Sequence, residues 1–399
     1  MRWRIYPRHR LDLTTGHLLR ALVACAHVEP AERLERAIEA DAGRDAIVCA
    51  SLRSGLELLL EALALDPGSE VLVSAITHLD MARILERHEL VPVAVDVEPD
   101  TLAPPVGAAE AAVTERTRAV LVAHLFGGRV DLTPLAALAA ERGLLLLEDC
   151  AQSLRGPHDR GDESADVSMF SFGSIKTCPA LGGALLYVRR PEVLERMRLL
   201  RGGWRRQARR EYAARVARFF GLCALQNAAV YGLFVRAGAA AGIDTDQLVN
   251  GVVHALKPPS AEEGDEFGRW LRRRPSAALL ALLRHRLHSF DTDRLARRAA
   301  LGGELASSLP GRLSHPGAAA LDRTHWVFPV VPDDPGALIE ALRAAGFDAT
   351  RATTSIGAVG SPPPPRAVEL MEHIVFIPAY PELPRSAVER LRGVLAKAT

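Results

Sequence analysis

The sequence predicts an α/β protein with a large domain, built on a mainly parallel seven-stranded sheet, and a smaller C-terminal α+β domain. A length of 399 residues suits two such domains better than one small hydrophobic core. Between residues 45 and 190, short apolar runs alternate with segments whose apolar residues recur at helical spacing, the rhythm of βαβ units. In the last third of the chain, strands and helices follow each other without that rhythm.

The large sheet is predicted from seven short apolar runs, at residues 46–50, 70–73, 91–95, 119–123, 144–147, 167–172 and 184–188. Helical spacing between these runs predicts helices at residues 56–65, 80–87 and 132–142. The dipeptides Pro67-Gly68 and Pro99-Asp100 supply turns. The order of elements therefore indicates a large domain over residues 1–202.

The C-terminal domain is predicted over residues 271–399. Its expected elements are a helical region at 276–305, a strand at 326–331, a helix at 335–345, a strand at 374–377 and a helix at 386–396. Ser361 and the four prolines after it predict a stiff extended loop over residues 361–365.

Residues 203–270 interrupt the pattern and form an atypical basic and apolar helical insert. Six arginines fall between residues 205 and 218, and an apolar run follows at 219–235, interrupted by Gln226 and Asn227. Seventeen residues with two amides are too short and too polar for a bilayer span. Two interpretations stay open. Residues 205–235 form a helix on an anionic membrane surface, or the insert caps the active site or packs on a partner subunit.

Composition excludes several classes of function. The net charge of +1 gives no overall attraction to nucleic acid, and no basic stripe is interleaved with aromatics outside the insert. Five scattered cysteines without a Cys-x-x-Cys pair argue against disulfides and against a structural zinc site. The N-terminus has no apolar signal region, so we expect a cytoplasmic protein. From the scattered cysteines we expect no bound metal.

Lys176 is the leading catalytic candidate. The chain has only three lysines against 46 arginines, so lysine is expected where a deprotonatable amine is required. Lys176 is the one charged residue of the stretch 167–186. An apolar environment lowers the pKa of an amine and keeps it nucleophilic.

Asp149 follows the predicted strand 144–147, at the edge where open α/β sheets place their ligands. A lysine that forms a Schiff base and an aspartate that protonates a pyridine nitrogen are the minimum apparatus of pyridoxal 5′-phosphate (PLP) chemistry. Gln152 can bond the phenolic oxygen of this cofactor. Taken alone, Asp149 is equally a strand-end turn residue, and Gln152 an ordinary loop amide.

A phosphate site is predicted where residues 51–55 connect a strand to a helix, because backbone N–H groups at a helix start bind phosphate. Arg53 adds a charge-assisted contact, and Ser171 is placed to reach the same phosphate. His78, after another strand, can stack on the pyridine ring. Each signal is weak alone, and their combination is much stronger.

Five segments, in order along the chain, resemble the DegT/StrS family of PLP-dependent sugar aminotransferases, which share the aspartate-aminotransferase (type I) fold. They are VPVAVDVEPDTL (91–102), HLFG (124–127), EDCAQS (148–153), SFGSIK (171–176) and FIPAYPEL (376–383). The likeness is continuous over residues 46–201 and recurs at 274–287, which is somewhat under half of the chain.

The resemblance implies a role for each candidate residue. Lys176 would bind the cofactor covalently, and Asp149 would pair with the ring nitrogen. Gln152 would contact the phenolic oxygen, and His78 would stack on the ring. Ser54 and Ser171 would hold the phosphate. In the family an arginine reaches toward the cofactor of the neighbouring subunit. Arg274 matches it, which implies a homodimer.

The implied activity is transfer of an amino group from an amino acid, with glutamate as the expected donor, to a keto group of a nucleotide-linked sugar, in polysaccharide or antibiotic sugar biosynthesis. Lys176 would move the proton between substrate and cofactor. The alternatives are another PLP reaction of the lyase or aldolase type, and a non-catalytic regulatory or assembly protein of the same fold.

The sequence departs from the family pattern at three places. The Gly-Thr phosphate turn of the family reads Leu52-Arg53, the asparagine after the lysine is Thr177, and the asparagine two residues before Arg274 is Arg272. The first change affects phosphate binding, and the later ones affect the subunit contact and the acceptor pocket.

Overall fold

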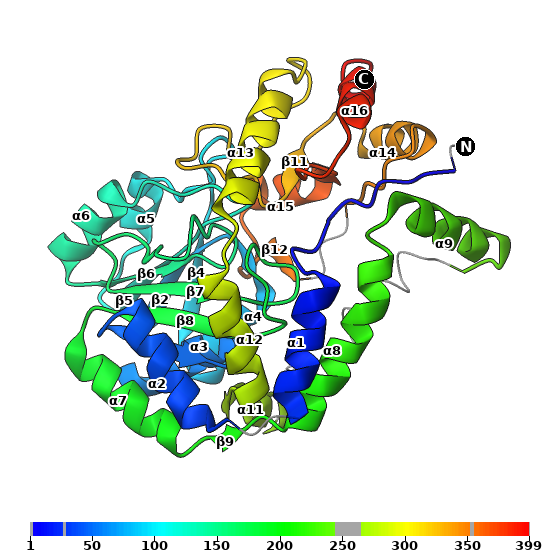
Figure 1. Ribbon diagram of the computed structural model, residues 1–399. Coiled ribbons are helices and arrows are strands. Elements are labelled where there is room, and N and C mark those ends of the chain that lie inside the picture. The colour runs from blue at the N-terminus through cyan, green and yellow to red at the C-terminus, as the bar shows by residue number, and fades with distance from the viewer. Residues whose placement is uncertain (1–2, 27–28, 244–264, 352–354, 399) are drawn as a thin grey trace.

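The computed structural model describes residues 3–26, 29–243, 265–351 and 355–398 (Figure 1). Its main feature is one seven-stranded sheet, in the order β1 (Ala46–Cys49), β8 (Ala184–Val188), β7 (Val167–Ser171), β6 (Leu145–Asp149), β5 (Thr117–Ala123), β2 (Glu70–Ser74) and β4 (Val91–Val95). Strand β8 runs antiparallel to both neighbours, and all other pairs are parallel. The predicted mainly parallel seven-stranded sheet is therefore confirmed.

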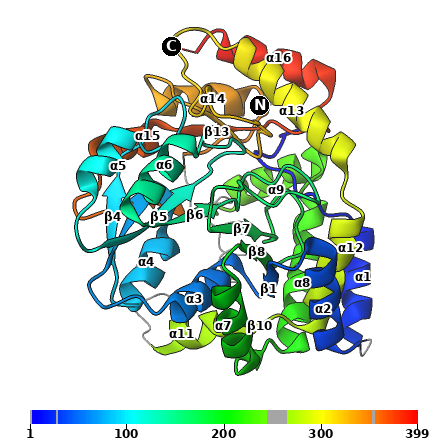
Figure 2. The same ribbon diagram turned by 90° about the vertical axis from the view of Figure 1, so that its left-hand side faces the viewer.

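Helices cover both faces of this sheet (Figures 1 and 2). One face packs on α3 (Leu52–Leu63), α4 (Leu79–Arg87), α7 (Pro191–Gly202) and α11 (Asp265–Leu271). The other packs on α1 (Thr15–Ala26), α2 (Ala31–Ala42) and α12 (Ala277–His288) at the β1 end, and on α5 (Val106–Ala112) and α6 (Thr133–Arg142) at the β5 end. Burial on both faces explains why the strands read as continuous apolar runs.

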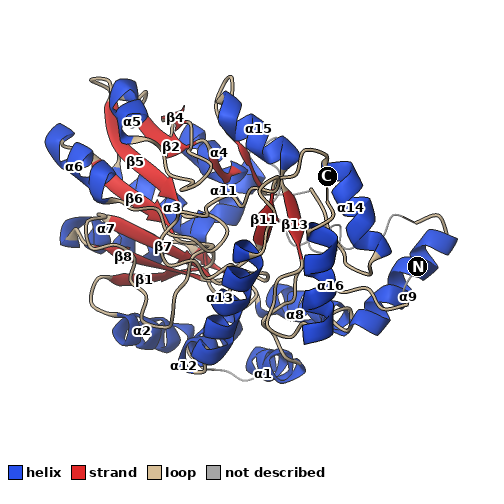
Figure 3. Cartoon of the chain, turned by 90° about the horizontal axis from the view of Figure 1, so that it is seen from above, coloured by secondary structure: helices blue, strands red, loops and turns tan. Residues whose placement is uncertain are grey.

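The C-terminal part forms a separate core around a small antiparallel sheet of β11 (Phe328–Val330) and β13 (Val375–Ile377) (Figure 3). Helices α13 (Thr292–Ser307), α14 (Pro335–Ala344) and α16 (Arg385–Leu395) pack on it. The prediction of an extended loop over residues 361–365 is wrong for its last residue, because Pro365 is the first residue of helix α15 (Pro365–His373). Proline suits the first helical turn, where its missing N–H would have no partner within the helix.

Helix α12, which the sequence analysis placed in the C-terminal domain, packs instead with the large sheet. Its Leu279, Leu282 and Leu283 are fully buried in the core that contains α1, α2 and strands β1 and β8. The buried residues of the separate C-terminal core begin with Leu305, and Tyr6 and Leu301 pack against them. The predicted boundaries near residues 202 and 270 remain a proposal for the division of the chain.

The first part of the insert folds as two helices, α8 (Arg209–Ala224) and α9 (Ala228–Ala240), which meet at 96°. In the described part of the chain no single helix is long and apolar enough to cross a membrane. Taken together, the two helices of this bent pair have the length and the apolar composition that a membrane crossing needs. Tyr212, Val216 and Phe219 of α8 are fully buried in the core that contains α1. Strand β9 (Arg205–Arg206) pairs with β10 (Arg273–Arg274), and insert residues 244–264 lie outside the described ranges.

Candidate active site

A cavity of about 220 Å³ lies at the carboxyl ends of the parallel strands, where β6 and β7 end and α3 begins. Seven of the eight predicted site residues line this cavity: Lys176, Asp149, Gln152, Ser171, Arg53, Ser54 and His78. They come from separate parts of the large domain. The structure therefore brings together residues that the sequence analysis linked only by their chemistry.

Lys176 lies on the turn after β7, and its backbone N–H donates to the Gly173 carbonyl at 3.1 Å. Its Nζ is 4.5 Å from the centroid of the Trp326 indole, which covers the amine. The pKa of Lys176 is lowered to about 8, mainly by burial; the Asp149 carboxylate opposes this change, and the charge of Arg53 adds to it. At pH 7 about a tenth of this amine is therefore neutral and nucleophilic, far more than of an ordinary lysine.

This lowered pKa predicts how the reactivity of Lys176 depends on pH. Only the neutral amine reacts with acetic anhydride, so in the cofactor-free protein the acetylation rate of Lys176 should rise up to about pH 8 and then level off. The rate is measured by mass spectrometry of the peptide that contains Lys176. A rate that still climbs tenfold per pH unit above pH 9 would show an ordinary surface lysine.

Asp149 ends strand β6 and is almost fully buried. Its Oδ1 accepts a hydrogen bond from the backbone N–H of Ala151 at 2.9 Å, and no described residue donates to Oδ2. Burial raises the pKa of this carboxyl group, against the opposing effects of the Ala151 N–H and the Lys176 charge. A cationic group in the cavity would therefore be a favourable partner for Asp149.

Gln152 presents a fixed amide to the cavity. Its Oε1 accepts from the backbone N–H of Phe126 at 3.0 Å. Phe126 holds the left-handed φ of 56°, which is uncommon for a bulky residue and is typical of strained functional sites. Because the amide oxygen is engaged, the NH₂ group is the part left to donate to a ligand.

The start of α3 forms the phosphate end of the cavity. Ser51 caps the helix, because its Oγ accepts from the Ser54 N–H at 3.1 Å and lies 3.0 Å from the Ser54 Oγ. The N–H groups of Leu52 and Arg53 have no acceptor among the described residues. Free N–H groups at a helix start form an anion-binding site. Ser171 adds a hydroxyl group, which accepts a long 3.4 Å bond from the Gly173 N–H.

His78 forms part of the cavity wall. It ends β3 (Ile76–His78), which pairs with β12 (Ile356–Ala358), and it caps helix α4. Its Nδ1 accepts from the Asp80 N–H at 3.2 Å, which leaves Nε2 to carry the ring proton. These contacts fix the plane of the imidazole at the cavity.

Arg274 is the predicted site residue that lies outside the cavity. Its Nη2 is 2.6 Å from Oε2 of the buried Glu35 in the same chain. The contact with a neighbouring subunit that the resemblance implies for Arg274 therefore stays a prediction.

Several residues that line the cavity were not predicted from the sequence, among them Trp326, Trp270, Arg215 and Arg273. Trp326 follows Lys176 by 150 positions, and no local spacing relates the two. Arg215 was hidden within the run of arginines. A helical signal did exist, because Arg215 lies beside Tyr212, Val216 and Phe219 on the apolar side of α8.

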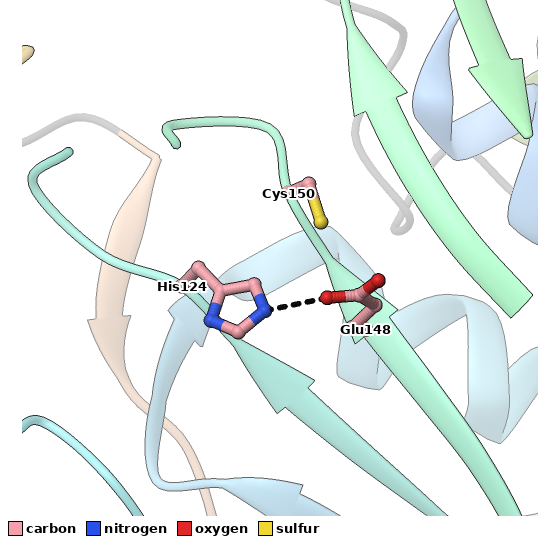
Figure 4. Close-up of side chains that lie close together, drawn as sticks. All are labelled: His124, Glu148 and Cys150. Atoms are coloured by element: carbon pink, nitrogen blue, oxygen red, sulfur yellow. Dashed lines mark hydrogen bonds and ion pairs between the residues drawn. The ribbon is translucent and has the colours of Figure 1, made fainter. Parts of the chain in front are cut away.

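A buried polar cluster of His124, Glu148 and Cys150 lies at the end of β6 (Figure 4), and its last two members flank Asp149 in the sequence. The His124 Nε2 donates to the Glu148 Oε2 at 2.7 Å, while its Nδ1 accepts from the Val130 N–H at 3.0 Å, so His124 is neutral. Its hydrogen bond with Glu148, together with the charge of Arg129, lowers the pKa of Glu148 to about 2 against the effect of burial.

Three atoms of this cluster, from His124, Glu148 and Cys150, lie within 4.8 Å of one another, close enough to hold a metal ion. However, the Arg129 Nη1 is 3.1 Å from Glu148 Oε2 and 2.9 Å from Cys150 Sγ. A guanidinium group already neutralises this carboxylate, and a metal ion beside it would be repelled. The cluster therefore supports the strand end that carries Asp149.

Together the sheet topology and the lysine-bearing cavity define a PLP-dependent transferase fold of type I. A solved structure has the same fold: the aminotransferase TlmJ from Streptoalloteichus hindustanus matches with a TM-score of 0.67 over 98% of this chain and 96% of its own, at 21% identity. The model of the DegT/DnrJ/EryC1/StrS aminotransferase family matches residues 26–229. The chain belongs to this family.

Two curated relatives match part of the chain. The UDP-N-acetyl-3-dehydro-α-D-glucosamine 3-aminotransferase of Acidithiobacillus ferrooxidans is 36% identical over 180 residues, which are 42% of this chain and 48% of that protein. The GDP-perosamine synthase of Caulobacter vibrioides is 33% identical over 162 residues, 40% of this chain and 43% of that protein. The chain thus spans a little under half the length of each of these relatives.

Proposed function

We propose that this protein is a PLP-dependent aminotransferase that moves an amino group from an amino acid, with glutamate as the expected donor, to a keto group of a nucleotide-linked sugar. The observation that carries the proposal is the shielded, partly neutral amine of Lys176 in one cavity with the buried carboxylate of Asp149. Family membership and the names of the two curated relatives support it.

The residues present fit PLP, because for each functional group of the cofactor the cavity offers a residue of suitable chemistry. Asp149 would hold the ring nitrogen protonated, the NH₂ of Gln152 would donate to the phenolic oxygen, and the imidazole of His78 would stack on the ring. The start of α3, with Ser54 and Ser171, would bind the phosphate. When bound, PLP supplies an electron-withdrawing ring that stabilises negative charge at the substrate carbon.

In this proposal the chain's own residues position the substrate and move one proton. The neutral Lys176 Nζ would accept the proton from the α-carbon of the amino donor, and the resulting ammonium would then deliver it to the reactive carbon of the cofactor. The Trp326 indole keeps water away from Nζ and stabilises the ammonium form by a cation–π contact. Asp149 remains ionised throughout and balances the charge on the ring nitrogen.

The absorption spectrum of the purified protein with PLP tests this function. We expect a visible band from lysine-bound cofactor that glutamate removes, and borohydride should fix PLP on Lys176 rather than on Lys397 or Lys257, of which Lys257 lies outside the described ranges. A band that glutamate leaves unchanged would favour another donor or lyase or aldolase chemistry. If no band forms, the enzymatic proposal fails, and a regulatory role of the fold takes its place.

The acceptor, the assembly and the location are part of the same proposal. The name of one curated relative contains a UDP-linked sugar, and the name of the other contains GDP-perosamine. Keto sugars that carry UDP or GDP are therefore the first acceptors to screen. We propose a cytoplasmic homodimer, which sedimentation tests. We also propose that residues 205–235 contact a membrane surface, because Val230 and Leu233 of α9 are exposed apolar side chains. Vesicle flotation tests this contact.

A further inference from the structure

Three guanidinium groups from three segments line the phosphate end of the cavity. They belong to Arg53 at the start of α3, Arg215 on α8 and Arg273 on β10. The Cζ atoms of Arg53 and Arg273 lie 5.0 and 5.3 Å from the centroid of the Trp270 indole, so both cations contact the same ring. Such contacts orient a guanidinium without neutralising its charge.

Arg215 belongs to the insert and Arg273 to the segment directly after it. Ion pairs on both sides of Arg273 hold that segment against helices of the same chain. The Arg272 Nε is 2.9 Å from Oε1 of Glu57, a fully buried residue of α3. Arg274 pairs with the buried Glu35, and β10 is hydrogen-bonded to β9. These contacts direct Arg273 toward the cavity of the subunit to which it belongs.

The positive charge at this end of the cavity is only partly balanced. Arg53 pairs with Asp80 at 2.6 Å, and Arg273 pairs with Glu211 at 2.9 Å. Arg215 donates from Nη1 to the Leu181 carbonyl at 2.8 Å, while its Nε is buried without a hydrogen-bond partner among the described residues. Burial and the charges of Arg273 and Arg53 lower the pKa of Arg215. No described carboxylate forms an ion pair with Arg215, and a half-buried cation without such a partner is unfavourable, so this end of the cavity favours binding of an anion.

The position of Arg215 relates this anion site to the start of α3. A Cβ atom at Gly182 would lie 3.3 Å from the Arg215 Nη1 and 3.6 Å from the Ala50 carbonyl at the end of β1. Helix α3 begins two residues after Ala50, and the N–H groups of Leu52 and Arg53 have no acceptor among the described residues. Arg215 and the helix start therefore face the same small volume.

We propose that Arg215 and Arg273, together with Arg53, bind the phosphate of PLP within their own subunit. The inference rests on the proposed function. Arg215 of the insert and Arg273 just after it then supply cationic contacts from the same chain. The family pattern instead has an arginine from the neighbouring subunit and a Gly-Thr turn, which here reads Leu52-Arg53. Three guanidinium groups suit a phosphate dianion, because each donates charge-assisted hydrogen bonds.

Titration of the cofactor-free protein with PLP and with pyridoxal, which lacks the phosphate, tests this assignment. Binding is followed by tryptophan fluorescence, since Trp270 and Trp326 line the cavity. Arg215→Gln and Arg273→Gln should each weaken PLP binding about ten- to a hundredfold and leave pyridoxal binding unchanged. The exposed Arg210→Gln on the same helix is the matched control and should change neither.

Two results would overturn the assignment. Unchanged PLP affinity in both variants would mean that the arginines serve another anion, such as the carboxylate of the amino donor. Equal weakening of PLP and pyridoxal would mean that the variants damage the cavity as a whole. Failure of the proposed function looks different. The wild-type protein then takes no PLP on Lys176, whereas quenching by inorganic phosphate that Arg215→Gln abolishes would still support the anion site.

Mixed dimers distinguish contacts within a subunit from contacts across an interface. Lys176→Ala subunits are paired with subunits that carry Arg215→Gln and Arg273→Gln, and borohydride fixing of PLP is measured at a low PLP concentration. If the arginines act within their own subunit, the mixture fixes as little PLP as the double variant alone. Restored fixing on the double-variant subunit would show that the arginines act on the neighbour, against the proposal.

Discussion

Replacing Lys176 by alanine is expected to slow the glutamate half-reaction by about 10³- to 10⁴-fold, because it removes both the amine that binds the cofactor and the base that moves the proton. The reaction is followed by the loss of the visible band or, where no band forms, by the production of 2-oxoglutarate. The folded state should keep its stability, because burial already disfavours the charged form of this lysine, whose pKa is lowered to about 8.

The matched control for this variant is Lys397→Ala. Lys397 is exposed near the C-terminus, so its loss removes a lysine without touching the cavity, and the half-reaction should keep the wild-type rate. A Lys176→Ala protein that reacts as fast as this control would place the base elsewhere. The role proposed for Lys176 would then be wrong, whatever happens to cofactor binding.

The large sheet could be predicted because its physical pattern is local. Each strand is buried on both faces, as the burial of Ile47 and Val48 in opposite cores of β1 illustrates, so each strand reads as a short apolar run. The position of Asp149 followed from the same pattern, since it ends the run at 144–147. Lys176 stood out through the scarcity of lysine in this chain.

Packing partners could not be predicted in the same way. Helix α12 has an apolar surface that suits either core, and nothing in residues 277–288 states that it packs on α1 and α2. The same holds for Trp326, because the contact between its indole and Lys176 depends on how the two parts of the chain meet. Residues that approach each other only after folding leave no periodic signal.

Arginines show this limit most clearly. The arginines of the insert are alike in composition, and the sequence analysis treated them as one basic surface. In the structure Arg210 is exposed, whereas Arg215 reaches into the cavity past the buried Tyr212. Burial separates their functions, and the apolar residues that flank Arg215 at helical spacing were the available sign.

Arg129→Ala is expected to lower the free energy of unfolding by about 3–5 kcal/mol, because it leaves the fully buried Glu148 without its cation. Asp159 keeps its ion pair with Arg155 at 3.0 Å. The Arg129 guanidinium is 3.1 Å from Glu148 and 2.7 Å from Asp159, and both carboxylates are at most 1% exposed. Chemical denaturation followed by circular dichroism measures the loss. Arg142→Ala is the control, since Arg142 pairs with carboxylates at the exposed surface and should change stability by less than about 1 kcal/mol.

The effect of Arg129 should also depend on pH in a defined direction. In the folded protein the pKa of Glu148 is lowered to about 2, below its ordinary value of 4.5. This lowered pKa stabilises the fold above about pH 4.5, and the contribution is lost as the pH falls toward 2. The stability gap between wild type and Arg129→Ala should therefore narrow on acidification. A gap that stays constant down to pH 2 would mean that Arg129 acts through packing rather than through the charge of Glu148, and the ionic support of the strand end carrying Asp149 would then be disproved.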